Sequence, residues 1–267
     1  MPWKTVLTIA GSDSGGGAGI QADLKTFAVT GVHGASAVTA LTAQNTLGVQ
    51  GVQAVPAEFV RAQLQAVFED LAVHAVKTGM LWDAATVRVV ADELNRRPPV
   101  PLVVDPVMVA KGGASLLQAE AVEAMRNDLL PLCTVVTPNA EEASVLAGME
   151  VRDLAAAGEA AQRIRALGPR AVVVKGGHLE GEPTDLLCDD QGVITFPGRR
   201  IMTHRTHGSG CTFAAALASF LAQGLPLRES VGRAKKLVTW AIAHALPVGR
   251  GHGPVNPAAW FAWGMPS

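Results

Sequence analysis

The sequence predicts an α/β fold with a mostly parallel central sheet flanked by helices on both faces. Short apolar segments alternate along the chain with longer segments of helical spacing, which is the order of strands and helices in doubly wound sheets. The segments at residues 101–105, 134–137 and 171–175 are apolar almost throughout, as expected of parallel strands buried on both faces. No linker, repeat or low-complexity segment interrupts this order, so we expect a single domain over residues 1–267.

The first third of the chain predicts three strands, each followed by a helix. The second of these helices carries four apolar side chains on one side, which is therefore expected to pack on the sheet: Phe59, Leu64, Val67 and Leu71. The spacing of apolar residues predicts strands over 6–10, 35–41 and 75–80 and helices over 19–29, 57–71 and 84–94.

The last third of the chain predicts a β-hairpin followed by helices. Residues 184–190 and 193–200 have the pattern of two strands joined by a turn at Gln191-Gly192. Helical spacing then runs from Cys211 to about residue 244, with a break near Gly224 and Pro226.

Composition and charge exclude several classes of protein. The formal net charge of −1 and the lack of a lysine-rich run do not favour binding to nucleic acid. No segment approaches the roughly 20 apolar residues of a membrane span, and the apolar run near the N-terminus is too short for a signal peptide. Three cysteines without a CxxC pair indicate a reducing compartment. We expect a cytoplasmic protein with no nucleic-acid or membrane partner.

Polar residues follow the predicted strands at the points where the strands end. Residues 11–19, GSDSGGGAG, follow the first strand, and Asp105, Asn139, Glu142 and Lys175 follow later ones. Because ligands bind at the carboxyl ends of parallel strands, we expect these groups to converge on one edge of the sheet. Two acids and a lysine at one edge predict a site for magnesium and phosphate.

Each of these residues also has a purely structural interpretation. Asp105 is placed to cap the next helix, and Asn139 with Glu142 three residues later has the spacing of a capping box. Lys175 is compatible with an ordinary surface position. The combination favours the binding site over the separate structural roles.

Cys211 follows Gly208-Ser209-Gly210 where a turn becomes a helix. Free N–H groups at a helix start bind anions, and the same setting lowers the pKa of a cysteine to about 3.5–7.5. A thiolate there is a candidate base for an attacking hydroxyl group. The alternative is that Cys211 is a small buried apolar residue. The two glycines favour the first interpretation, because an ordinary helix start does not need them.

Seven segments stand in this order along the chain: GSDSGGGAGIQADLKTF (11–27), LTAQNTLGV (41–49), KTGML (77–81), VVDPVM (103–108), TPNAEEA (137–143), VVKGGH (173–178) and THGSGCTFAAALA (206–218). The most specific of them are AGSDSGGGAGIQAD and HGSGC. Together they resemble the hydroxymethylpyrimidine/phosphomethylpyrimidine kinases of thiamine biosynthesis, a family of the ribokinase superfamily, and the similarity extends from Val6 to about Ala259.

The resemblance implies a ribokinase-like fold, ATP and Mg²⁺ as cofactors, and phosphorylation of a pyrimidine's hydroxymethyl group and then of the resulting phosphate ester. It also implies a homodimer. Which loop closes over the substrate stays open between residues 11–19 and Lys111-Gly112-Gly113.

The resemblance also implies roles for individual residues. The implied catalytic residues are Cys211 and Lys175, together with Gly208 and Gly210, which bind the anion. The implied magnesium ligands are Asp105 and Glu142. The implied nucleotide contacts are Asn139, Lys175, Ser209 and Thr206. The implied pyrimidine pocket is Gln44, Gly11, Asp23, Met80 and Val107.

Two other functions fit the same residues. A pyridoxine or pyridoxal kinase of the same superfamily would use the same chemistry on another alcohol. A nucleotide-binding regulatory protein without catalysis is disfavoured, because Asp105, Asn139, Glu142, Lys175 and Cys211 are all present.

Overall fold

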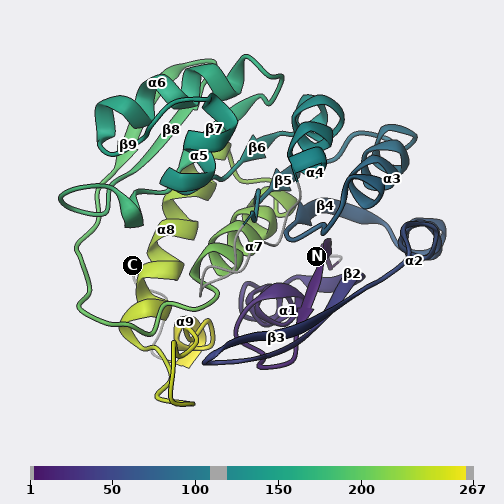
Figure 1. The fold of residues 1–267 in the computed structure, drawn as a ribbon, viewed down its shortest axis with the longest axis horizontal. Helices are drawn as coiled ribbons and strands as arrows, with labels where there is room; N and C mark the ends of the chain where they lie inside the picture. Colours follow the sequence, from purple (N-terminus) through teal and green to yellow (C-terminus); the bar gives the residue numbers. More distant parts are fainter. Residues whose placement is uncertain (1–2, 109–118, 263–267) are drawn as a thin grey trace.

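The computed structural model describes residues 3–108 and 119–262, in which nine strands form one sheet (Figure 1). The strand order is β3-β2-β1-β4-β5-β6-β7-β8-β9, and the six strands from β2 to β7 in this order are parallel. Three pairs of neighbouring strands are antiparallel: β3 with β2, β8 with β7, and β9 with β8. The strands are β1 Thr5–Asp13, β2 His33–Asn45, β3 Gly48–Ala54, β4 Val73–Thr78, β5 Leu102–Val104, β6 Val135–Val136, β7 Ala171–Val174, β8 Asp185–Asp189 and β9 Gly192–Phe196.

Helices cover both faces of the sheet (Figure 1). One apolar core joins the sheet to α2, α3, α4, α5 and α6, and a second joins its other face to α1, α7 and α8. The helices are α1 Gly19–Val29, α2 Ala57–Asp70, α3 Ala84–Asn95, α4 Ala119–Ala124, α5 Ala140–Ala147, α6 Leu154–Arg165, α7 Ser209–Ala222, α8 Leu227–Ala243 and α9 Ala259–Ala262, with short turns η1 Met125–Leu129, η2 Leu130–Leu132 and η3 Gly176–His178.

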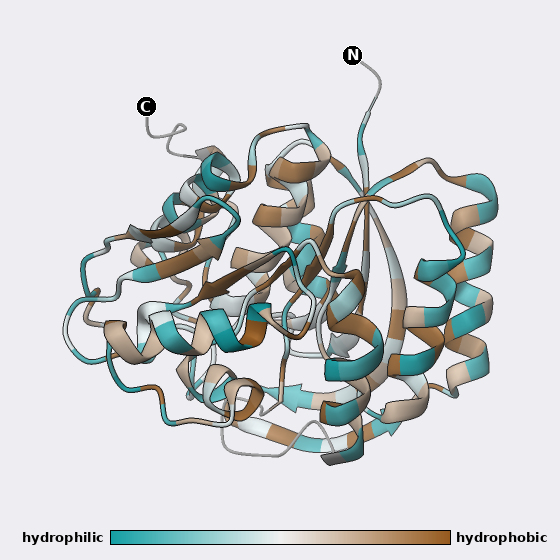
Figure 2. Cartoon of the chain, turned by 90° about the horizontal axis from the view of Figure 1, so that it is seen from above, coloured by the Kyte–Doolittle hydropathy of each residue, from teal (hydrophilic) through white to brown (hydrophobic). Residues whose placement is uncertain are grey.

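The central strands are apolar on both sides because both sides are covered. In β7, Val172 and Val174 lie in the core beneath α6, whereas Ala171 and Val173 lie in the core beneath α7 and α8. Figure 2 shows the result: hydrophobic strands in the middle and hydrophilic stripes on the outer surfaces of the helices. The predicted α/β fold with a mostly parallel sheet and helices on both faces is confirmed.

β3 was not predicted. Its sequence, GVQGVQA, contains two glutamines and two glycines and has no clear apolar alternation. β3 lies at the edge of the sheet and pairs only with β2, so neither of its faces has to be apolar throughout. The predicted hairpin is present as β8 and β9, and the predicted long helical region is present as α7 and α8.

The predicted buried side of α2 is partly wrong. Phe59 is 62% exposed, whereas its neighbour Val60 and the predicted Leu64 are fully buried. The helix is rotated about its axis relative to the prediction, because Val60 and Leu64, spaced four residues apart, face the sheet. The lid candidate Lys111-Gly112-Gly113 lies outside the described residues.

None of the helices within residues 3–108 and 119–262 combines the length and the apolar character that crossing a bilayer requires.

The orientation of α2 predicts contrasting effects of two substitutions. Leu64→Ala should lower the free energy of unfolding by about 2–5 kcal/mol, because it leaves a cavity in the core. Phe59→Ala, the matched control on the same helix, should change it by no more than about 0.5 kcal/mol. Urea denaturation followed by circular dichroism measures both. A larger effect of Phe59→Ala would contradict the assigned orientation.

Candidate active site

A cavity of about 790 Å³ lies at the carboxyl ends of the parallel strands. It extends from Gln44 near the end of β2, past the strand ends of β1, β4, β5, β6 and β7, to α8. Its walls contain all of the residues predicted for the site except Asp23. The residues that reach it are Gly11, Gln44, Met80, Asp105, Val107, Asn139, Glu142, Lys175, Thr206, Gly208, Ser209, Gly210 and Cys211. The convergence predicted from the strand ends is therefore present, whereas the role of each residue stays a prediction.

Lys175 and Asp105 form an ion pair in the middle of the cavity. Lys175 Nζ lies 2.7 Å from Asp105 Oδ1, which also accepts a hydrogen bond from Thr137 Oγ1 at 3.2 Å. Burial opposes the charge of the lysine, but the carboxylates of Asp105 and Glu142 outweigh it and raise the pKa of Lys175. The ammonium group is therefore charged and faces the cavity, where it can bind a phosphate group.

Asn139 and Glu142 form the capping box at the start of α5. The Asn139 side chain accepts from Glu142 N at 2.9 Å, and Glu142 Oε2 accepts from Asn139 N at 2.8 Å. Glu142 Oε2 also lies 3.9 Å from Lys175 Nζ. Burial raises the pKa of Glu142 to about 7, helped by the charge of Asp105 and opposed by Lys175. Asn139 and Glu142 thus form the capping box that their spacing predicts, and the Glu142 carboxylate and the Asn139 amide also line the cavity.

The donor set is compatible with a magnesium ion shared with a phosphate. Among the described residues, no group of three or more His, Cys, Asp or Glu side chains is arranged to hold a metal ion. Asp105 and Glu142 nevertheless both face the cavity, and their charges interact unfavourably, as the pKa of Glu142 indicates. Mg²⁺ typically takes one or two carboxylates and completes its shell with water and phosphate oxygens, so this pair fits it.

Two glycines lie at the start of α7, Gly208 in the turn before the helix and Gly210 in its first turn. Gly208 has a φ of 78°, and a Cβ there would collide with the carbonyl oxygen of Gly17 in the glycine-rich loop. A Cβ on Gly210 would lie 3.3 Å from Lys175 Nζ and 3.6 Å from Asp105 Oδ2. The first glycine permits contact between the two loops, and the second leaves room at the charged pair.

Cys211 lies in the first turn of α7 and is partly exposed. Burial raises the pKa of its thiol to about 11. Lys77 and the Gly19 N–H favour the thiolate, but the nearby carboxylates of Asp23 and Asp105 oppose it. The prediction of a lowered pKa is therefore wrong for the protein without ligands. A helix start does not suffice to ionise a thiol that packs against protein on its inner side and has two acids close by.

Asp23 does not line the cavity, contrary to the sequence-based expectation. It is fully buried, pairs with Lys77 Nζ at 2.8 Å and accepts from Thr8 Oγ1 at 2.7 Å. Its Oδ1 has no hydrogen-bond partner among the described residues. Lys77 does reach the cavity, and burial opposes its charge, but the surrounding anionic groups raise its pKa. The ion pair of Asp23 and Lys77 thus lies at the bottom of the site, beside Cys211.

One end of the cavity combines apolar groups with the Gln44 amide, and we call it the substrate end. Val107 packs against Met80, and the Met80 methyl group lies so close to Gly11 that a Cβ on Gly11 would collide with it. Together with Gln44 these groups line this end of the cavity. At the other end, α8 contributes a largely apolar wall that the sequence analysis did not identify: Val238, Ile242 and the hydroxyl-bearing Thr239.

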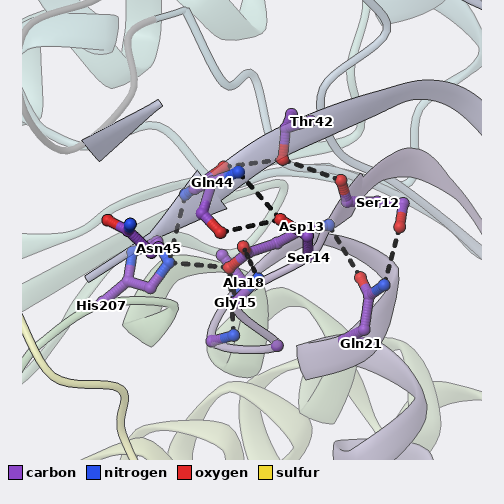
Figure 3. Close-up of polar contacts among 12 residues, drawn as sticks. Ser12, Asp13, Ser14, Gly15, Ala18, Gln21, Thr42, Gln44, Asn45 and His207 are labelled. Atoms are coloured by element: carbon purple, nitrogen blue, oxygen red, sulfur yellow. Dashed lines mark hydrogen bonds and ion pairs between the residues drawn. The ribbon is translucent and has the colours of Figure 1, made fainter. Parts of the chain in front are cut away.

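Asp13 and His207 were also missed, although both lie in the motifs that carried the resemblance (Figure 3). Asp13 accepts hydrogen bonds from the backbone N–H groups of Gly15, Gly17 and Ala18 at 2.8, 3.0 and 2.9 Å, and His207 Nε2 lies 2.9 Å from Asp13 Oδ2. An acid immediately before a glycine run is a signal for this kind of loop closure. His207, which reaches Asp13 from a distant part of the chain, has no such local signal in the sequence.

Solved structures of small-molecule kinases share this fold. A pyridoxal kinase from Bacillus subtilis, solved as an ADP complex, superposes with a TM-score of 0.92 at 39% identity and covers 98% of this chain and 100% of its own. A phosphomethylpyrimidine kinase from Clostridium difficile has a TM-score of 0.80 at 40% identity and covers 90% and 99%. The fold is that of the ribokinase-like kinases.

The family follows from the sequence comparisons. The family model for phosphomethylpyrimidine kinase matches residues 13–256. A hydroxymethylpyrimidine/phosphomethylpyrimidine kinase from Haemophilus influenzae is 49% identical over 258 residues, covering 95% of this chain and 96% of the relative. The chain belongs to the phosphomethylpyrimidine kinase family. It spans about half of a thiamine biosynthesis bifunctional protein from Geobacter sulfurreducens, with 54% identity over 257 residues and 52% of that protein covered.

The protonated state of Cys211 predicts its reactivity. Because the thiol pKa is raised to about 11, alkylation by iodoacetamide should be slow at pH 7 and accelerate about tenfold per pH unit up to about pH 10. Mass spectrometry measures the rate, and Cys211→Ser identifies the site; Cys133 and Cys188 are buried. A rate that is already constant between pH 7 and 9 would show an ionised thiol.

Proposed function

We propose that the protein uses ATP to phosphorylate hydroxymethylpyrimidine and then hydroxymethylpyrimidine phosphate, which yields the diphosphate for thiamine biosynthesis. One observation carries the proposal: a single cavity places an amide side chain suited to an aminopyrimidine, Gln44, together with groups suited to phosphate, Lys175 and the turn before α7. The family membership and relatives of about 50% identity that carry this name support it.

In this proposal the pyrimidine lies at the substrate end, where Met80 and Val107 pack on the ring. The amide of Gln44 offers one donor and one acceptor to a ring nitrogen and its neighbouring amino group. The nucleotide lies toward α8, with Thr206, Ser209 and Asn139 along its phosphates. The ADP and AMP-PCP complexes of related pyridoxal kinases support the binding of a nucleotide by this fold.

Lys175 and the N–H groups of Gly208 and Gly210 then hold the phosphoryl group as it passes to the hydroxymethyl oxygen. Phosphoryl transfer of this kind depends mainly on positioning and on neutralising charge. Asp105 and Glu142 would hold Mg²⁺, which when bound neutralises charge on the phosphates.

Cys211 accepts the proton of the hydroxymethyl group in this proposal. Only the thiolate form of Cys211 can accept this proton; with a thiol pKa of about 11 the thiolate is a strong base but a minor species at neutral pH. The loose transition state asks for little proton transfer early in the reaction, so the thiolate takes the proton late, when the forming P–O bond has made the hydroxyl group acidic. Lys77 and the Gly19 N–H are the groups that stabilise the resulting thiolate.

A pyridoxine or pyridoxal kinase is the second candidate. Its specific support is the TM-score of 0.92 to the Bacillus subtilis pyridoxal kinase, which exceeds that to the phosphomethylpyrimidine kinase structure. Sequence identity favours the first candidate, with 49% to the Haemophilus relative against 39% to the Bacillus enzyme.

We further propose that the protein is a cytoplasmic homodimer. Support comes from the resemblance and from the three cysteines, all of which are free thiols. Sedimentation velocity at micromolar concentration tests the dimer.

The two candidate substrates are distinguished by a ratio of rates. The wild-type protein should prefer hydroxymethylpyrimidine to pyridoxine by about ten- to a hundredfold in kcat/KM, because pyridoxine leaves part of the Gln44 amide unpaired. Gln44→Leu should lose most of this preference while slow turnover persists. Coupled measurement of ADP release gives both ratios. A wild-type ratio near one would favour the second candidate, and no turnover of either alcohol would overturn the proposed activity.

Lys175 should matter for turnover in both phosphorylation steps. Lys175→Met should lower kcat far more than it raises the KM of either alcohol, because the ammonium is needed most as charge develops. The matched control, Lys236→Met, changes an exposed lysine that does not line the cavity. Equal kcat values for the two variants, with only the thermal stability of Lys175→Met reduced, would make Lys175 structural.

A further inference from the structure

Asp185, the first residue of β8, is a buried carboxylic acid that lines the same cavity as Lys175. Its Oδ1 accepts a hydrogen bond from the backbone N–H of Gly176 at 2.7 Å and lies 2.9 Å from the ammonium nitrogen of Lys235 in α8. Lys235 Nζ also donates to the carbonyl oxygen of Pro183 at 2.7 Å. These contacts join the end of β7, the start of β8 and α8 at one side chain.

The pairing between β7 and β8, which are neighbours in the sheet (Figure 1), ends next to this contact. Val174 is the last residue of β7 that pairs with β8, and it lies opposite Leu186. Beyond it the chain turns into η3, and a Cβ on Gly176 would collide with the backbone carbonyl of Thr184. The Asp185 carboxylate accepts the Gly176 N–H at the point where the strands no longer pair.

The backbone on either side of the Lys175 side chain is therefore held by a different partner. The N–H of Lys175 donates to the carbonyl oxygen of Pro138, just past β6, at 2.8 Å. The next N–H, that of Gly176, donates to Asp185. Between these two bonds the Lys175 side chain leaves the strand and reaches Asp105 at 2.7 Å. The bond to Asp185 thus fixes the side of Lys175 that β6 does not hold.

The ionised state of Asp185 depends on Lys235. Burial raises the pKa of Asp185, and the ammonium of Lys235 opposes this effect most strongly. The lysine is closely packed: a Cβ on Gly198 would lie 2.9 Å from the Pro183 carbonyl oxygen and 3.1 Å from Lys235 Cε. A lysine confined in this way keeps its ammonium at the carboxylate, whereas an exposed lysine loses side-chain entropy when it pairs.

We propose that Asp185, held by Lys235, is a positioning residue that fixes the strand end from which Lys175 reaches the phosphate. The inference rests on the proposed function, in which the Lys175 ammonium holds the phosphoryl group during transfer. Asp185 acts through Lys175 and not through a contact of its own with a substrate. Such a role matters for the rate, because a displacement of about 1 Å in a catalytic group can cost about a hundredfold.

Hydrogen exchange of two backbone amides tests the positioning without any ligand. In the ¹⁵N-labelled 267-residue chain, Asp185→Ala should speed exchange at both Gly176 and Lys175 by about tenfold or more, the typical worth of a hydrogen bond to a charged group. Asp185→Asn keeps an oxygen that accepts the Gly176 N–H and should retain most of the protection. Faster exchange at Gly176 alone would show that Lys175 is held independently and would overturn the proposal.

The other end of β8 supplies a matched control. Asp189 also accepts a backbone N–H, that of Gln191 at 2.9 Å, and also pairs with a basic side chain of α8, Arg228, at 2.7 Å. It is not among the described residues that line the cavity. Asp189→Ala should lower the thermal stability but leave kcat and the exchange at Lys175 unchanged. Equal losses of kcat in Asp189→Ala and Asp185→Ala would trace both to a loosened β8 and overturn the positioning role.

A double-mutant cycle tests whether Asp185 acts through Lys175. Asp185→Ala should lower kcat by about ten- to a hundredfold, with a smaller change in the KM of the alcohol. In Lys175→Met, which already lacks the ammonium, adding Asp185→Ala should lower kcat by less than about threefold, because residues that act as a unit are not additive. Losses that multiply in the double variant would mean that Asp185 contributes independently and would overturn the proposal.

Asp185→Asn keeps the test decisive if Asp185→Ala does not fold. This variant should retain most of kcat together with the exchange protection at Lys175, and the loss of kcat with protection intact would overturn the positioning role.

The failure of this proposal is distinguishable from the failure of the proposed function. A wild-type protein that phosphorylates no alcohol would overturn the proposed function, and hydrogen exchange would then decide the positioning of Lys175 alone. An active wild-type protein whose kcat losses multiply would retain the proposed function and lose the positioning role of Asp185.

Discussion

The cavity depends on direct contact between two backbones, that of the glycine-rich loop after β1 and that of the turn before α7. Gly208 can approach the carbonyl of Gly17 only because it has no side chain, and a Cβ on Gly17 would in turn collide with the His207 ring. This contact brings Asp13 within hydrogen-bonding distance of His207, and it brings the Gly19 N–H to the Cys211 sulfur. A larger residue at either position would separate the groups that bind phosphate from those that face the substrate end.

Charge is the second organising feature of the site. Two lysines and three carboxylates lie at or beneath the cavity floor, and burial makes each of their charges dependent on its partners. This arrangement explains why the Cys211 thiol is protonated despite its place at a helix start, and why the pKa of Glu142 rises to about 7. A bound phosphate and its cation would change this balance, so the charge states of the protein without ligands are a starting point of the reaction.

The fold does not distinguish the two candidate substrates. Pyridoxal kinases and phosphomethylpyrimidine kinases superpose on this chain over almost its whole length. The difference between them has to come from a few polar side chains at the substrate end, because one scaffold supports several substrates through such changes.

The sequence alone determined most of the strands and helices and the residues at the strand ends. These follow from local rules, because period-two and helical spacing depend on backbone geometry and polar residues at the ends of parallel strands share one edge. The tertiary structure alone decided that Phe59 faces solvent, that β3 closes one edge of the sheet, that Asp23 lies beneath the cavity rather than in it, and that the pKa of Cys211 is raised. It also decided the pairings of Asp23 with Lys77, 54 residues apart, and of Asp13 with His207, 194 residues apart. Burial and pairing depend on which distant groups pack together, and local spacing carries no information about them.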